Sequence, residues 1–88
     1  MHTERSRTVR IRIKSEERIF QGTAKQIVQQ MKATAQRADH LSLDAYVDWC
    51  AQNGAVMGHD VKIEGEGEDA RCASLVAEMV RFGIAEKL

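Results

Sequence analysis

The sequence predicts a small α+β domain in which three helices pack on one face of a three-stranded sheet, with element order ββααβα. Three observations lead to this fold class. The chain of 88 residues has the length of one domain, alternating apolar and charged residues indicate strands, and apolar residues at helical spacing indicate helices. We expect residues 8–88 to form a single domain and residues 1–7 to form a flexible basic arm.

The clearest strand pattern covers residues 9–14, where apolar residues alternate with basic ones. A strand needs this period of two to bury one face and expose the other. Residues 18–21 are rich in β formers and follow a three-residue connection, residues 15–17, which predicts a hairpin. Because the first strand alternates most strongly, we expect it in the middle of the sheet.

The third strand is expected over residues 61–64, where two apolar residues alternate with one base and one acid. Glycines stop this run on its C-terminal side. The last residues, 84–88, fit either a frayed turn or a short edge strand, and their pattern does not separate the two.

Three helices are predicted from apolar stripes, over residues 24–37, 43–53 and 68–82. The first begins after Thr23, which forms a capping-box pattern with the glutamine three positions later. The second is expected to end at Gly54, because glycine enters the left-handed conformation after a helix without a Cβ clash.

The overall composition excludes several classes of protein. The 13 basic and 13 acidic side chains cancel, so no whole-molecule attraction to nucleic acid or to an anionic membrane is expected. No apolar stretch is long enough to cross a bilayer, and no signal-peptide core follows the charged start. Two cysteines are too few for a disulfide framework. We therefore expect a soluble, cytoplasmic protein with reduced thiols.

The charges are distributed unevenly along the chain. Residues 1–38 hold nine bases against three acids, a net charge of +6, and residues 39–88 hold four bases against ten acids, a net charge of −6. One interpretation is intramolecular: a third strand beside the first would bring Glu64 and Lys62 close to the first strand's bases. The other is that the basic strand face and the acidic turn at 64–69 are separate surfaces that meet a partner or a second copy.

Trp49 and Met57 supply a possible apolar centre for such an interface. Trp49 lies beside the apolar stripe of the second helix, and Met57 follows in a loop next to a glycine. Both residue types are enriched at interface centres, although packing at the edge of the core explains Trp49 as well. The residues expected to bind a partner are Arg10, Arg12, Lys14, Trp49, Met57, Glu64 and Glu66.

No pattern predicts catalysis, a cofactor or a metal site. Cys50 and Cys72 fall on predicted buried stripes, and neither forms a metal-ligand spacing with His59. The sequence therefore favours a non-enzymatic module that binds a protein partner or itself through complementary charged faces. The alternative is a nucleic-acid-binding accessory protein that uses the basic strand face, although aromatic residues for base stacking do not alternate with these bases.

Overall fold

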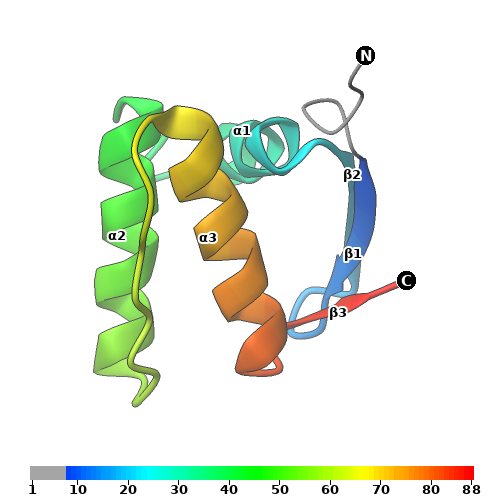
Figure 1. Cartoon of the computed structure of the whole chain (residues 1–88). Coiled ribbons are helices and arrows are strands. Elements are labelled where there is room, and N and C mark those ends of the chain that lie inside the picture. The colour runs from blue at the N-terminus through cyan, green and yellow to red at the C-terminus, as the bar shows by residue number, and fades with distance from the viewer. Residues whose placement is uncertain (1–7) are drawn as a thin grey trace.

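The computed structural model describes residues 8–88 and places a three-stranded sheet against three helices (Figure 1). The basic arm expected at residues 1–7 lies outside the described residues. In chain order the elements are β1 (Val9–Ile13), β2 (Arg18–Gly22), α1 (Ala24–Thr34), α2 (Leu43–Val56), α3 (Glu68–Arg81) and β3 (Ala85–Lys87). The predicted class, a small α+β fold with one three-stranded sheet and three helices, is confirmed.

The sheet is antiparallel with strand order β2-β1-β3, so the first strand is central as expected. The predicted hairpin joins β1 to β2 through residues 14–17. Glu17 has φ 57, in the left-handed region that a tight connection demands and that a non-glycine residue seldom adopts. In the register, Arg12 lies between Ile19 of β2 and Glu86 of β3.

The helices all lie on one side of the sheet, in two layers (Figure 1). α1 packs against β2 and α3, while α3 also reaches β3. α2 packs against α1 and α3 and lies farthest from the sheet. The opposite face of the sheet, called here the outer face, is covered by no described helix.

The core forms where the inner face of the sheet meets α1 and α3. Its fully buried side chains come from every helix and from the central strand, and they are Ile11, Ile27, Val28, Val47, Cys72 and Leu75. Burying one such aliphatic side chain contributes about 1.5–3 kcal/mol relative to leaving it exposed. This inner layer fixes which side chains of β1 are left for the outer face.

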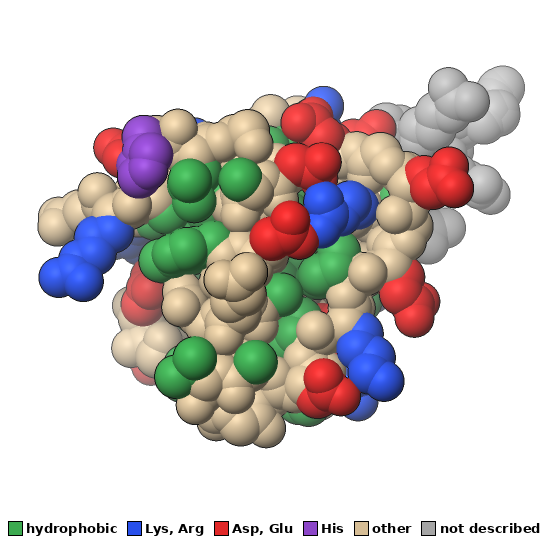
Figure 2. Space-filling model, turned by 90° about the vertical axis from the view of Figure 1, so that its left-hand side faces the viewer, with side chains coloured by type: hydrophobic (Ala, Val, Ile, Leu, Met, Phe, Trp, Pro, Cys, Tyr) green, Lys and Arg blue, Asp and Glu red, His purple; other side chains and the backbone are tan. Residues whose placement is uncertain are grey.

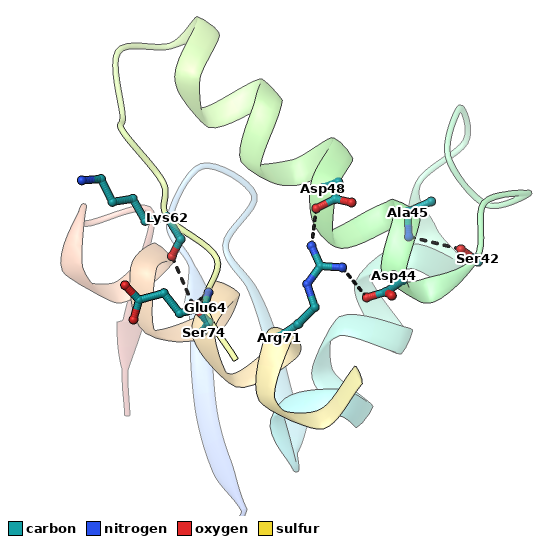
Figure 3. A network of polar contacts seen from close by, with 8 residues as sticks. All are labelled: Ser42, Asp44, Ala45, Asp48, Lys62, Glu64, Arg71 and Ser74. Atoms are coloured by element: carbon teal, nitrogen blue, oxygen red, sulfur yellow. Dashed lines mark hydrogen bonds and ion pairs between the residues drawn. The ribbon is translucent and has the colours of Figure 1, made fainter. Parts of the chain in front are cut away.

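The third strand was predicted in the wrong place. Residues 61–64 form no strand and run beside α3, where side chains of the helix bind their backbone. The amide of Lys62 donates to Glu78 Oε2 at 3.0 Å. The amide of Glu64 donates to Ser74 Oγ at 3.0 Å, and Figure 3 shows Ser74 beside Lys62 and Glu64. The third strand is instead formed by the C-terminal residues Ala85–Lys87.

The second helix does not end at Gly54, as predicted, but continues to Val56. Gly54 is buried because the returning chain packs on it: a Cβ added there would lie 2.8 Å from Cγ2 of Val61. Gly58, with φ 93, is the left-handed glycine after the helix. α1 also ends earlier than expected, since Ala35 adopts an extended conformation after Thr34.

Among residues 8–88, no helix combines the length and the apolar character that crossing a membrane requires.

Candidate functional site

The outer face of the sheet gathers the basic side chains of Arg10 and Arg12 from β1 and that of Lys14, which directly follows the strand. Ile11 and Ile13 are buried at 1% and 6% exposure, so the alternate residues Arg10, Arg12 and Lys14 belong to the opposite side. These three residues were expected to share one exposed face, and the structure brings them together there.

Arg12 is neutralised by the neighbouring strand. Its Nη2 donates to both carboxylate oxygens of Glu86, at 2.8 and 2.6 Å, and the two residues face each other in the register. Both side chains are partly exposed. The Nε atom of Arg12 is buried without a hydrogen-bond partner among the described residues. The intramolecular interpretation placed Glu64 and Lys62 beside these bases on the condition that residues 61–64 pair with the first strand. That placement is wrong because residues 61–64 do not join the sheet.

Arg10 and Lys14 remain available on the outer face. Both are exposed, and neither forms an ion pair with any residue from 8 to 88. Two aliphatic side chains accompany them: Ile19 is 47% exposed opposite Arg12, and Leu88 is 55% exposed. The amide of Leu88 donates to the carbonyl of Arg10 at 2.8 Å, which fixes this residue beside the strand. The outer face thus combines unneutralised cations with exposed aliphatic surface.

The predicted acidic surface is partly neutralised by a base from the other half of the chain. Lys25 Nζ lies 3.2 Å from Glu68 Oε1 and 4.0 Å from Asp69 Oδ1. The hydrogen bond with Glu68 and the charges of both acids raise the pKa of Lys25. Glu64 and Glu66 are exposed in the loop before α3 and make no ion pair with a described residue. They lie on the helical side of the molecule, away from the basic strand.

A second group of acids is bound by Arg71. Its guanidinium donates to Asp44 at 2.6 Å and to Asp48, joining α3 to α2 (Figure 3). The hydrogen bond with Asp48 is the largest cause of the raised pKa of Arg71. On the face of the molecule over α2, acidic and basic side chains are intermixed (Figure 2). The charges of that face therefore largely compensate one another locally.

Trp49 and Met57 lie on α2 and at its end, separated by eight residues or about 12 Å of helix rise. Trp49 is half-buried and stacks on Tyr46, with ring centroids 5.7 Å apart. Met57 is 72% exposed beside Val56, which is 87% exposed. Hydrophobic side chains appear as separate groups on this face (Figure 2). Trp49 thus packs at the core edge, while the exposed aliphatic surface near Met57 comes from Val56.

The cysteines and His59 occupy different surroundings. Burial raises the pKa of the Cys50 thiol to about 11, although a hydrogen bond with Tyr46 lowers it. Burial likewise raises the pKa of Cys72 to about 11. The ring of His59 packs against Phe82, with centroids 5.0 Å apart. Over residues 8–88, no group of three or more potential metal ligands comes together.

Two residues of the outer face, Glu86 and Ile19, could not be assigned to it from the sequence. Glu86 belongs to the C-terminal tail, whose conformation the pattern left open. Ile19 lies in a predicted strand, but the pattern did not indicate which face of the sheet it occupies.

Comparison of the chain with family models, with curated proteins and with solved structures finds no match.

Proposed function

We propose that this chain is a non-enzymatic interaction module that binds an acidic surface of another protein through the outer face of its sheet. The observation that carries the proposal is the pair of exposed cations, Arg10 and Lys14, on a face that no described helix covers. Exposed Ile19 and Leu88 supply apolar contact area beside them. Charge complementarity provides specificity and fast association, whereas buried apolar area provides much of the affinity.

The acidic surface is proposed to come from a different protein. The chain's own acids are mostly engaged: Arg71 binds Asp44 and Asp48, and Lys25 binds Glu68 and Asp69. A second copy therefore offers chiefly Glu64 and Glu66 to the basic face, a small patch for a stable contact. Self-association through these residues is one outcome of the experiment below.

A protein surface is favoured over nucleic acid by the side chains of the outer face. Base stacking on a sheet requires aromatic rings on the exposed side. The aromatic residue of the described strands is Phe20, which is 6% exposed on the inner face. Phosphate contacts from Arg10 and Lys14 alone would be non-specific and strongly dependent on salt.

A charge-reversal pair tests the proposal. Lys14→Glu reverses a charge on the outer face, and Arg37→Glu makes the same kind of change after α1, at an exposed cation without an ion pair among the described residues. Each tagged protein is used to capture partners from native lysate treated with nuclease, and captured proteins are identified by mass spectrometry. We expect a nuclease-resistant, acidic partner that wild type and Arg37→Glu retain and that Lys14→Glu loses.

Three results would contradict the proposal. Equal capture by Lys14→Glu would place the contact elsewhere, and loss of capture after nuclease treatment would indicate a nucleic acid. Recovery of a second copy of the chain, with a solution mass that falls as salt rises, would indicate self-association.

We further propose that the module works in the cytoplasm. Cys50 and Cys72 are free thiols with raised pKa values, as expected for a protein that keeps its cysteines reduced. The raised values also weigh against a nucleophilic cysteine, which needs a stabilised thiolate. Imaging of the tagged protein in its native cell checks the compartment, and an extracytoplasmic signal would contradict it.

A further inference from the structure

The inner face of the sheet is not completely filled by the helices. An open hollow of about 610 Å³, called here the alkyl groove, lies between α3 and the central strand. From α3 it is lined chiefly by Ala73, Val76, Ala77 and Val80, and from β1 by Val9 and Ile11. Its polar lining residues are Thr23, Lys25, Asp69 and Lys87, of which Lys25 and Asp69 face each other at 4.0 Å. Its volume falls within the range of about 300–1,000 Å³ that is typical of small-molecule sites.

Two properties of the fold keep this groove open. β3 has only three residues and leaves part of α3 without a strand opposite it. The α3 residues that face the gap include the small alanines 70, 73 and 77, which do not fill it. From Ala70 to Val80 the helix rises about 15 Å, so the groove has the length of an extended alkyl chain rather than of a compact ring.

A second hollow of about 440 Å³ adjoins the first, and Val9 and Lys87 line both. Lys87 is exposed and forms no ion pair with another described residue, whereas Lys25, which also lines the groove, is engaged by Glu68 and Asp69. The aliphatic groove is therefore bordered by one cation without an ion pair, Lys87, which pairs in the register with Ile11 of the inner face.

We infer that the alkyl groove binds a free medium-chain carboxylate, with its alkyl chain along Ala73 and Ala77 and its carboxylate beside Lys87. Two properties of the groove indicate this ligand: the charge beside it and the lack of hydrogen-bonding groups along its apolar walls. The alanine and valine side chains along α3 and β1 offer no hydrogen-bond partner, so a peptide lying along them would leave backbone groups unsatisfied, whereas an alkyl chain has none. The unpaired cation beside the groove, Lys87, matches an anionic head group.

The test is an amide-resolved NMR titration of the whole chain with decanoate below its micelle concentration. Binding in the groove shifts the amides of Val9, Ala73, Ala77 and Lys87 with one saturable isotherm. Acetate carries the head without the chain, and decyltrimethylammonium carries the chain with the opposite charge. We expect no saturable binding of acetate and weaker binding of the cationic amphiphile than of decanoate.

Substitutions locate the two parts of the ligand. Ala77→Phe fills the groove and is expected to weaken decanoate binding about tenfold or more, since it displaces at least two methylene groups of the chain. Ala33→Phe, at an exposed alanine of α1 outside the groove, is the matched control and should leave binding unchanged. Lys87→Gln should weaken binding about two- to five-fold, as loss of an exposed ion pair does.

The inference is overturned if decanoate gives no saturable shifts, if decyltrimethylammonium binds equally well, or if Ala77→Phe binds decanoate like wild type. Should Ala77→Phe fail to fold, Lys87→Gln and the head-group comparison still decide. Binding to anionic phosphatidylglycerol vesicles without binding of monomeric decanoate would also overturn it. Lys14→Glu should leave decanoate binding intact and Lys87→Gln should leave partner capture intact, so the groove and the outer face can fail separately.

Discussion

Replacing Glu86 by glutamine removes the charge that neutralises the central base of the outer face. Arg12 Nη2 lies 2.6 Å from one carboxylate oxygen of Glu86 and 2.8 Å from the other. Glutamine keeps the size of the side chain but accepts only a weaker, neutral hydrogen bond. The substitution should therefore destabilise the fold slightly while it increases the positive charge of the outer face.

The expected loss of stability follows from the exposure of the pair. The side chains of Arg12 and Glu86 are 40% and 31% exposed, so solvent screens their attraction. A pair of this kind contributes about 0.5–1 kcal/mol. In a domain of this size 1 kcal/mol corresponds to about 4–8 °C in Tm, so Glu86→Gln should lower Tm by about 2–8 °C.

Urea unfolding of wild type, Arg12→Gln, Glu86→Gln and the double variant measures the coupling free energy of the pair directly. The coupling should shrink in 1 M salt, where the screening length is only about 3 Å. A coupling free energy of zero, or one that does not change with salt, would refute the assignment. Under the proposed function, Glu86→Gln should also capture more of the acidic partner at low salt, because Arg12 becomes available.

Other predictions concern the core, the stability at acid pH and the packing of Val61 on α2. Leu75→Ala, at a core position that is 1% exposed, should cost about 2–5 kcal/mol in urea unfolding; a loss below 1 kcal/mol would place Leu75 outside the core. Hydrogen bonding to Arg81 is the largest cause that lowers the pKa of Glu78 to about 2 from 4.5, so the unfolded state binds more protons between these values. Stability should then fall as the pH drops through this window, and Glu78→Gln should flatten that slope; an unchanged slope would contradict the shift. Gly54→Ala should destabilise by about 1 kcal/mol, because crowding Val61 outweighs the better helix propensity, and adding Val61→Ala should remove that cost.

Periodicity predicted the central strand because it reports one-sided burial, and β1 is buried on one side. The same signal failed at residues 61–64, where Val61 and Ile63 are half-buried and their neighbours are exposed. This segment lies against a helix instead of a sheet, and side chains of Glu78 and Ser74 bind its backbone. Alternation alone does not tell which kind of element covers the apolar side.

The C-terminal strand could not be assigned from the sequence, because its three residues, Ala85–Lys87, contain hardly more than one two-residue period of apolar and polar alternation. Its identity depends on pairing with β1, a contact with residues far away in the sequence. The neutralisation of Arg12 by Glu86 therefore could not be predicted from the sequence. The grouping of Arg10, Arg12 and Lys14 on one face could be predicted, because they are spaced two residues apart. The alkyl groove was likewise unpredictable, since it arises from the mismatch between a short strand and a long helix.

A photoreactive benzoylphenylalanine at Ile19 tests the central claim most directly. Ile19 stands on the outer face, and Val56, at the end of α2, is an exposed aliphatic control on another surface. After irradiation in native cells, the Ile19 variant should form a covalent adduct with an acidic protein, and the Val56 variant should not. An adduct from Val56 alone, or a nuclease-sensitive adduct from Ile19, would contradict a protein-binding role for the uncovered face of the sheet.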